Sequence, residues 1–474
     1  FNTNYHYIVP EIEGDTQISL LGSKPFDEFT EAKSLGILTK PVITGAFTFL
    51  KLTKTTGNKN SLDFVEDIIK AYSEILERFN ALGAEWVQFD EPALVMDLSA
   101  ADILLLNKIY SEVLLAKGNS RVLLQSYFGD IRDCYQEVMA LPFDGIGLDF
   151  VEGKDTLELV RSNGFPTDKT LFAGLVNGKN IWRNNYEKTM TILAELKRTT
   201  TDIVVSTSCS LLHVPYTLKN ETALSDEYKK YFAFAEEKLA ELAELSRIIS
   251  CVTPAEIPEY IENVRLFQEN RFRPDDYVQV AISALSQEDF IRHPAVEERE
   301  KIQKAEFNLP LLPTTTIGSF PQTTEVKANR SNYKTGKISF EKYNRFIQEK
   351  IAECVALQEK IGLDVLVHGE FERNDMVEYF GECLDGFLFT DKAWVQSYGT
   401  RCVKPPIIWG DISRPRPITV DYAVYAQSLT GKYMKGMLTG PVTILNWSFP
   451  REDISLKECA YQIALAIRAE VLDL

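Results

Sequence analysis

Short, nearly continuous apolar runs alternate with helical stretches over the first 250 residues. This alternation predicts a parallel sheet covered by helices, because the strands of such a sheet are buried on both faces. The β-rich runs are residues 42–50, 86–90, 121–128, 145–150, 170–176 and 203–210. Their spacing favours a (β/α) barrel.

The pattern changes after residue 225. Residues 225–250 predict a charged helix rich in Ala and Leu, and residues 251–312 are rich in Pro and charged residues and end at LPLLP. We interpret residues 251–312 as an interdomain connector. β-rich runs resume at 314–320, 364–371 and 436–445. The predicted domains are therefore 1–250 and 313–474.

An internal repeat links the two predicted domains. KPVITGAFTFLKL at 40–52 matches KGMLTGPVTILNW at 435–447, with Thr44-Gly45 aligned to Thr439-Gly440. Each copy is followed by a loop and a predicted helix that begins Ser-Leu, so we infer a duplication.

The repeat allows the strands to be counted. Two predicted strands precede the Thr-Gly strand of the second copy, and the Thr-Gly strand of the first copy begins a series of six; together they make eight, the number in a closed barrel. We predict an α/β fold with two (β/α)8 TIM-type barrels from an internal duplication, both incomplete. The chain would hold the last six strands of one and the first three of the other. It starts without Met and stops inside the amphipathic run 455–474, so we expect both ends to be missing.

Composition narrows the class of partner. The net charge of −17 disfavours nucleic acid and anionic membranes, which require dense Lys and Arg. We find no apolar run of membrane-spanning length and no targeting segment. Seven scattered cysteines without a CxxC motif fit a reducing cytoplasm. The chain is expected to be a cytoplasmic monomer that binds small molecules, with no nucleic-acid or membrane partner.

Long motifs identify a family resemblance. Four of them resemble the C-terminal barrel of cobalamin-independent methionine synthase: LPTTTIGSFPQTTEVKANR at 312–330, DVLVHGEFERNDMVEYFGE at 364–382, WVQSYGTRCVKPPIIWGDI at 394–412 and LTGPVTILNWSF at 438–449. SCSLLHVP at 208–215 and FNTNYHYIVPE at 1–11 resemble the N-terminal barrel. The resemblance implies two face-to-face barrels and a methyltransferase that moves a methyl group from 5-methyltetrahydrofolate polyglutamate to the zinc-activated thiol of homocysteine.

Two motifs are similar to the part of the family's site that holds homocysteine. In Ile317-Gly318-Ser319, glycine permits a close backbone approach and serine can donate to a carboxylate. A glycine-dependent turn is the alternative. Glu370 lies at the end of the predicted strand 364–371 and can accept hydrogen bonds from an amino group. Its neighbour His368 is more typical of a hydrogen-bonded core histidine.

Three residues match the family's folate site. Arg401 offers a fixed fork of donors for pterin or glutamate oxygens. Cys402 follows it, but has no nearby His that would make it a nucleophile. Trp447 offers an indole for stacking on a pterin, and the first repeat has Leu52 at this position. A surface Arg, an inert Cys and ordinary Trp packing are the alternatives.

The resemblance places the zinc ligands, a His-x-Cys pair, a Glu and a later Cys, on second-barrel strands beyond residue 474. The first-barrel counterparts are Gln125, Tyr127, Asp149 and Cys209, which lack the soft ligands of a zinc–thiolate site. We therefore expect no metal ligand and no catalytic residue in this chain. Asp90, at the end of a first-barrel strand, is expected to be structural.

Two alternatives to this function stay open. A related barrel methyltransferase could take its methyl group from another donor, such as a corrinoid. The 474 residues could also be a catalytically silent binding fragment, and for the isolated chain we expect no turnover.

Overall fold

The computed structural model describes residues 9–269, 271–272 and 274–474. Residues 1–8 of the FNTNYHYIVPE motif lie outside the described residues. The chain divides into two units: unit 1 runs to Glu269 and includes Asp391–Val403, and unit 2 contains the rest. The segment Asp391–Val403, which our boundaries place in residues 313–474, thus groups with unit 1. The boundaries at 250 and 312 stay predictions.

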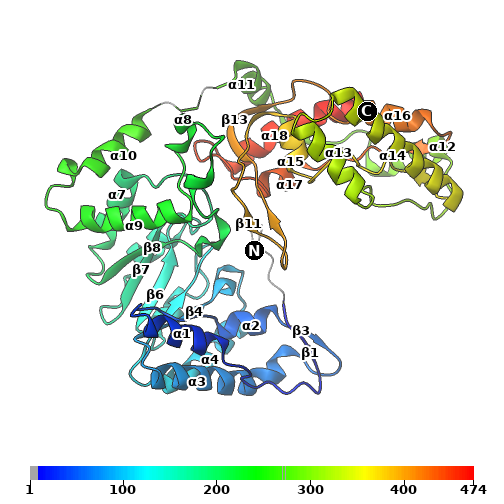
Figure 1. Ribbon diagram of the computed structural model, residues 1–474. Helices are drawn as coiled ribbons and strands as arrows, with labels where there is room; N and C mark the ends of the chain where they lie inside the picture. Colours follow the sequence, from blue (N-terminus) through cyan, green and yellow to red (C-terminus); the bar gives the residue numbers. More distant parts are fainter. Residues whose placement is uncertain (1–8, 270, 273) are drawn as a thin grey trace. The chain divides into compact units, whose positions relative to one another are not determined.

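A six-stranded sheet forms the centre of unit 1 (Figure 1). All its neighbouring strands are parallel, in the order β2-β4-β5-β6-β7-β8. The strands are β2 (Val42–Thr44), β4 (Trp86–Asp90), β5 (Arg121–Gln125), β6 (Gly145–Asp149), β7 (Thr170–Val176) and β8 (Ile203–Thr207). Each lies within a predicted run, which confirms an α/β fold with a parallel sheet.

Helices follow the strands of unit 1 and bury one face of the sheet. Val87 and Phe89 of β4 have no exposed surface and pack in the main hydrophobic core. On the opposite face, Trp86 and Phe172 meet edge to face over Gly145, where a Cβ would come within 3.1 Å of both rings. The described helices of unit 1 with eight or more residues are α1 (Lys24–Ser34), α3 (Val65–Ala81), α4 (Ala100–Val113), α6 (Thr156–Asn163), α7 (Tyr186–Leu196), α9 (Ala235–Ser250) and α10 (Pro258–Gln268).

Each copy of the repeat contains a helix, so the prediction of one long strand in each copy was wrong. Gly45 begins α2 (Ala46–Leu52) with φ −69° and ψ 153°, and Gly440 begins α17 (Pro441–Asn446) with φ −72° and ψ 154°. A continuous apolar run does not separate a buried strand from a short buried helix, and these glycines act as helix N-caps. The shared backbone geometry supports the duplication.

Three segments of unit 2 lie side by side. β9 (Val365–Leu366) pairs in parallel with β14 (Tyr433–Met434), and Gly369 forms a parallel bridge with Ser319. The amide of Val365 also donates to the Thr314 carbonyl (3.1 Å). The predicted strand 314–320 is thus limited to one bridge. The predicted strand 436–445 lies after β14, where the chain turns into α17. Two incomplete barrels therefore remain a prediction.

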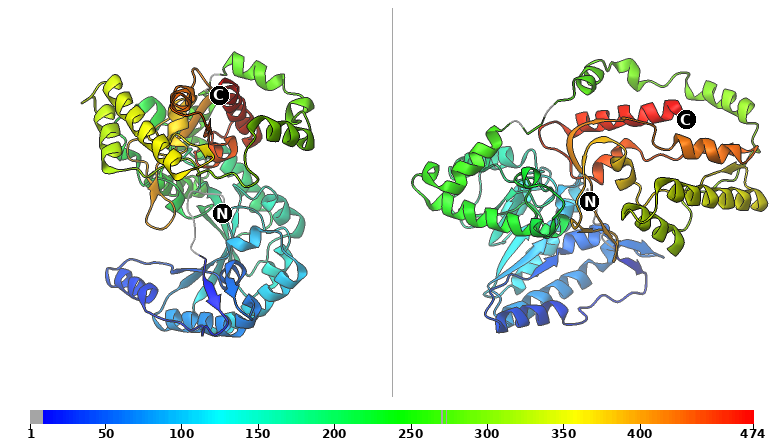
Figure 2. Two further views of the ribbon diagram at one scale, coloured as in Figure 1. Left: turned by 90° about the vertical axis from the view of Figure 1, so that its right-hand side faces the viewer. Right: turned by 45° about the horizontal axis from the view of Figure 1, so that its top comes forward.

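Helices make up much of unit 2 (Figure 2). α14 (Phe340–Ile361) begins at the N-cap Ser339 and ends at Gly362, whose φ is +91°. It packs with α13 (Thr324–Lys334) and α16 (Val420–Ser428) around one apolar core. α17 and α18 (Leu456–Asp473) pack with the antiparallel pair β10 (Asp385–Leu388) and β13 (Ile407–Ser413) around another. α11 (Asp276–Ser283) and α12 (Val296–Phe307) precede these helices.

Candidate active site

The turn after β9 contains two consecutive residues in the left-handed region. Gly369 has φ +94° and Glu370 has φ +57°. Glycine adopts this conformation freely, whereas a non-glycine residue there is uncommon and is held by its surroundings. The Glu370 side chain keeps 15% of its surface exposed. This turn presents a carboxylate that the solvent reaches.

An arginine of α13 holds this turn. Arg330 donates through Nη2 to the carbonyls of Phe371 (3.0 Å) and Arg373 (2.6 Å), and to Oε1 of Gln322 (2.7 Å). Three acceptors on one guanidinium nitrogen fix the loop against α13. The turn is therefore held by a side chain of α13.

A buried charged network lies beneath Glu370. Glu372 is 4% exposed and bonds to His368 Nε2 (3.0 Å) and Arg373 Nε (2.8 Å). Burial by itself raises the pKa of Glu372, but the His368 contact and the Arg373 charge lower it to about 2. Glu372 is thus ionised at neutral pH. His368 is buried and hydrogen-bonded, as expected for a core histidine.

The structure brings Ile317-Gly318-Ser319 next to Glu370. A Cβ on Gly318 would lie 2.3 Å from Glu370 Oε1, so this position requires glycine for a close approach. The amide of Phe320 donates to the Gly369 carbonyl (2.9 Å), which fixes the two segments in register. Ile317 is 83% exposed, and Ser319 is exposed. The predicted homocysteine residues therefore form one cluster.

The segment leading into α17 joins this cluster. Arg373 donates through Nη2 to the Met437 carbonyl (2.7 Å), and the Thr439 hydroxyl donates to the Met376 carbonyl (2.7 Å). Trp447 is the C-cap of α17 and lies partly buried against the apolar core around α17 and α18. It therefore belongs to unit 2, at the opposite end of α17 from these contacts.

Arg401 and Cys402 lie in a different unit. They belong to the hairpin of β11 (Val395–Gln396) and β12 (Cys402–Val403), which groups with unit 1 (Figure 1). Both are exposed. The structure thus assigns the predicted folate residues to two units: Arg401 and Cys402 to unit 1, and Trp447 to unit 2.

At the end of β4 in unit 1, the carboxylates of Asp90 and Glu91 are held by hydrogen bonds inside the fold. Glu91 has no exposed surface and accepts from the amides of Phe47 (2.9 Å) and Thr48 (2.7 Å) and from the Tyr110 hydroxyl. Burial raises the pKa of Glu91 to about 7, although these hydrogen bonds lower it. Burial also raises the pKa of Asp90 to about 6, against hydrogen bonds from Gln88 and Tyr127.

Asp149 and Cys209, which we matched to zinc ligands from the sequence, are engaged in the fold in other ways. Asp149 accepts from the amides of Phe128, Val151 and Glu152 (2.8–2.9 Å), so its oxygens are occupied. Burial raises the pKa of the Cys209 thiol, which keeps it protonated. Within the described ranges, no three His, Cys, Asp or Glu side chains are grouped to hold a metal ion.

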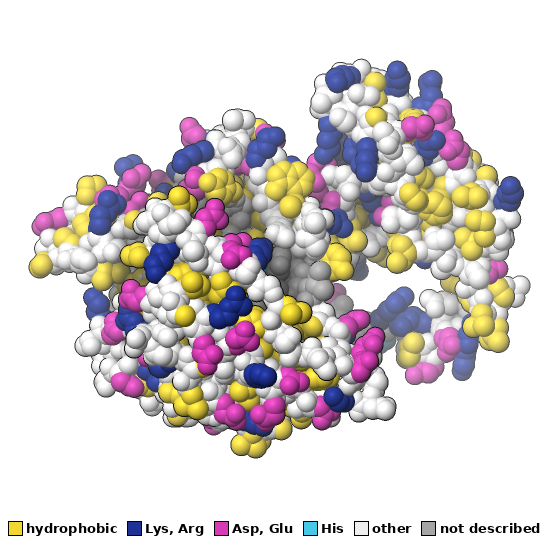
Figure 3. Space-filling model, turned by 60° about the horizontal axis from the view of Figure 1, so that its bottom comes forward, with side chains coloured by type: hydrophobic (Ala, Val, Ile, Leu, Met, Phe, Trp, Pro, Cys, Tyr) yellow, Lys and Arg dark blue, Asp and Glu magenta, His cyan; other side chains and the backbone are white. Residues whose placement is uncertain are grey.

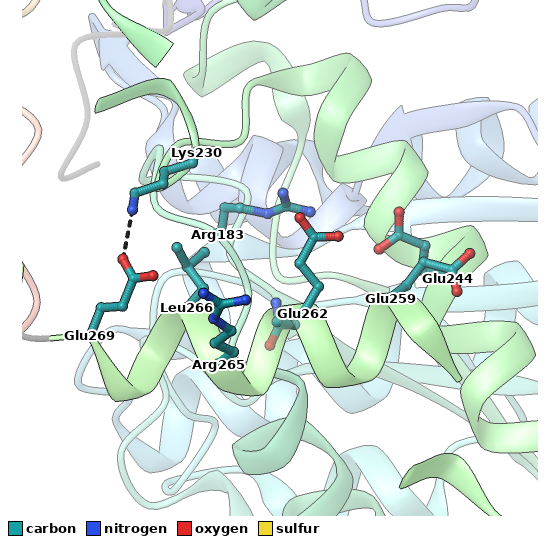
Figure 4. A pocket seen from close by; sticks show the side chains of 9 residues that line it. Arg183, Lys230, Glu244, Glu259, Glu262, Arg265, Leu266 and Glu269 are labelled. Carbon is teal, nitrogen blue, oxygen red and sulfur yellow. Dashed lines mark hydrogen bonds and ion pairs between the residues drawn. The ribbon is translucent and has the colours of Figure 1, made fainter. Parts of the chain in front are cut away.

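A cavity of about 270 Å³ in unit 1 lies apart from these motifs (Figure 4). Its lining includes Arg183, Arg265 and Lys230 together with four glutamates. Lys230 pairs with Glu269 (2.6 Å) at one side of it. In Figure 3 acidic and basic side chains are likewise interspersed over the visible face. No helix of the described residues is long and apolar enough to cross a membrane.

Comparisons with known proteins define the class. The family model "Cobalamin-independent synthase, N-terminal domain" matches residues 1–201, and "Cobalamin-independent synthase, Catalytic domain" matches residues 312–474. The chain belongs to the cobalamin-independent methionine synthase family.

Curated relatives and a solved structure were also found. Proteins named 5-methyltetrahydropteroyltriglutamate–homocysteine methyltransferase from Lactococcus lactis subsp. cremoris (strain MG1363) and Campylobacter jejuni subsp. jejuni serotype O:23/36 (strain 81-176) are each 56% identical over 474 residues. The chain spans 62% and 63% of their lengths. A crystal structure titled as a putative vitamin-B12 independent methionine synthase from Listeria monocytogenes gives a TM-score of 0.40 at 13% identity, over 50% of this chain and 71% of that one, too low to support an argument.

Several supporting residues were not predicted. Arg330, Glu372 and Arg373 hold the site turn, and Met437 packs against Gly318. Glu372 and Arg373 stand in the HGEFER motif, so a charged pair directly after the Glu370 turn is a signal that could have indicated them. Arg330 lies in a polar helix, where its long-range contacts leave no local signal.

Proposed function

We propose that the full-length protein transfers a methyl group from a 5-methyltetrahydrofolate polyglutamate to homocysteine, giving methionine. The observation that carries the proposal is the cluster of Gly318, Ser319 and Glu370, held by Arg330 and Arg373. The names of the curated relatives support the substrates.

The cluster suits an α-amino acid. The Glu370 carboxylate can accept two hydrogen bonds from an ammonium group, while the Ser319 hydroxyl can donate to a carboxylate. Arg373 lies with Nη1 3.5 Å from Glu370 Oε2 and can orient that oxygen. We assign the binding of homocysteine to Ile317-Gly318-Ser319 and Glu370.

The methyl donor is assigned to Arg401, Cys402 and Trp447. The exposed Arg401 can donate to pterin or glutamate oxygens, and the partly exposed Trp447 can stack on a pterin. We also propose two incomplete (β/α)8 barrels, a cytoplasmic location and a monomer.

Zinc is the metal that we propose for the full-length protein, where it would supply the charge that ionises the homocysteine thiol. The described residues of this chain do not provide its ligands, so the chain's own contribution is substrate binding and orientation.

The test is a methyl-transfer assay with purified full-length protein, homocysteine and 5-methyltetrahydropteroyltriglutamate, without cobalamin. We expect stoichiometric methionine. A protein that leaves this donor unused but demethylates a methylcorrinoid would contradict the donor assignment and favour the related methyltransferase. The isolated 474-residue chain, assayed in parallel, is expected to give no turnover.

A further inference from the structure

Glu221 binds the segment that leads into the β11–β12 hairpin. It follows the short helix η5 (Leu218–Asn220), and its side chain is almost completely buried. Its two carboxylate oxygens accept from the amides of Asp391 and Lys392, each at 2.7 Å. All three residues belong to unit 1. One buried carboxylate thus holds two consecutive amides 170 residues further along the chain.

The hairpin itself is small. β11 and β12 pair through Val395 with Val403 and Gln396 with Cys402, and the Ser397 amide donates to the Arg401 carbonyl (2.8 Å). A two-stranded hairpin is at best marginally stable in water. It therefore depends on attachment to the rest of unit 1.

The attachment fixes which side chains face outward. Ala393, Val395 and Ser397 are at most 4% exposed, whereas Trp394 and Tyr398 are 53% and 64% exposed. Alternate residues of a strand point to opposite faces, so Cys402, the partner of Gln396, lies on the face opposite Val395. A rotation or a slip of the hairpin would turn Arg401 and Cys402 away from their present direction.

We infer that Glu221 is a positioning residue for methyl-donor binding, because it fixes the hairpin that carries Arg401 and Cys402. The inference rests on the proposed function, in which those two residues contact the donor. Hydrogen bonds to a buried carboxylate are strong, and removing the acceptor leaves two amides unsatisfied. Glu221 acts through the hairpin and does not itself contact substrate.

Hydrogen exchange tests the attachment without any variant. Asp391 and Lys392 are exposed residues outside regular structure, where amides ordinarily exchange fast. In the full-length protein we expect both amides to exchange at least about 100-fold more slowly than in an unstructured peptide. Unprotected amides would overturn the inference.

The kinetic test compares Glu221→Gln with Glu237→Gln in the full-length protein. Glu237 accepts from the amides of Leu218 and Phe234 in the same unit but has no hydrogen bond to the hairpin, so it controls for loss of charge. For Glu221→Gln we expect an increase of about ten-fold in KM for the methyl donor, the equivalent of one weakened hydrogen bond. KM for homocysteine should stay within about two-fold, and trypsin should cleave faster after Lys392 and Arg401. Glu237→Gln should leave all three unchanged.

Arg401→Ala separates failure of the inference from failure of the proposed function. If Arg401→Ala raises KM for the donor and Glu221→Gln does not, the positioning role is wrong and the donor site stands. If neither variant changes it, the assignment of the hairpin to the donor is wrong, and the positioning role with it. An increase in both, restored toward the wild-type value by Glu221→Asp, supports the inference.

Discussion

The two copies of the Thr-Gly repeat begin their helices with nearly the same backbone angles at Gly45 and Gly440. They differ in the space that surrounds these two glycines. In the first copy, a Cβ on Gly45 would come within 2.1 Å of the Glu91 carboxylate, which binds the first amides of α2. In the second copy, a Cβ on Gly440 would meet no described atom within 4 Å. Glu91 fills the space at Gly45 in the first copy, whereas the space at Gly440 in the second copy is open. Thr439, directly before Gly440, bonds to the segment that follows Glu370.

The difference teaches how to distinguish a structural strand end from a candidate site. Asp90-Glu91 in unit 1 would suggest acid–base chemistry from sequence, but every oxygen of Glu91 serves a helix amide or a tyrosine. In unit 2 the buried Glu372 accepts from Arg373 Nε. Glu370, whose Oε2 lies 3.5 Å from Arg373 Nη1, stays partly exposed in a left-handed turn. The partly exposed acid, whose oxygens are not both held by hydrogen bonds inside the fold, is the one available to a ligand.

The largest expected effect is on the closed copy. Glu91→Ala should lower the free energy of unfolding of unit 1 by about 3–5 kcal/mol, because two helix amides and the Tyr110 hydroxyl lose a buried acceptor. Chemical denaturation followed by the fluorescence of Trp86 and Trp182 measures it. A loss below about 1 kcal/mol would show that Glu91 does not close the first copy.

The pH dependence of stability should have opposite signs in the two units. Glu91 has a raised pKa of about 7, so folded unit 1 binds an extra proton between pH 4.5 and 7 and loses about 3 kcal/mol as the pH rises through this window. Glu372 has a lowered pKa of about 2, so unit 2 loses a similar amount as the pH falls from 4.5 to 2. In denaturation series, Glu91→Gln should reduce the pH dependence of unit 1, to which Asp90 with its pKa of about 6 also contributes. Glu372→Gln should reduce that of unit 2. Flattening of the wrong window would contradict these assignments.

The equivalent glycines give a matched pair of variants. Gly45→Ala should destabilise by about 1–3 kcal/mol, because the new methyl overlaps the Glu91 carboxylate, which cannot leave its amides. Gly440→Ala should cost less than about 1 kcal/mol, because its φ and the surrounding space accept alanine. Thermal unfolding of both variants measures the difference in their stability. Equal losses of stability would contradict the difference between the two glycine sites.

The smallest effect concerns one of the positions where the copies differ in sequence, Leu52 and Trp447. Trp447→Leu should raise KM for the methyl donor by about 2- to 12-fold, the loss of about 0.5–1.5 kcal/mol of stacking. Trp409→Leu in the same unit is the control, because Trp409 packs against Phe272, with 5.9 Å between the ring centroids. If the control matches Trp447→Leu, stacking is not the cause.

The sequence predicted much of the sheet in unit 1 but less of the repeat. β4, β6 and β7 lie in runs bounded by turn residues, so length and composition were sufficient. Gly45 and Gly440 were interpreted as residues within strands, because the apolar run continues through the helix that follows each glycine. The signal was Pro441, which suits the first position of a helix.

The candidate site was predicted in part, for a physical reason. Glu370 and Gly318 stand in long motifs, and the structure brings them together. Arg401 groups with unit 1, and the segment that leads to it is bound by Glu221, an acid in an ordinary polar loop 170 residues away from Asp391. A contact between residues so far apart leaves no pattern in the sequence around either residue.

The most direct test of the central claim compares Glu370→Gln with Glu378→Gln in the full-length protein, with the kinetics of homocysteine as the readout. Their side chains are similarly exposed, 15% and 17%, in the same unit. We predict that Glu370→Gln lowers kcat/KM for homocysteine by about 10- to 100-fold, the value of a hydrogen bond to a charged group. Glu378→Gln should stay within about two-fold of wild type. Wild-type kinetics in Glu370→Gln, with the variant folded, would contradict the account.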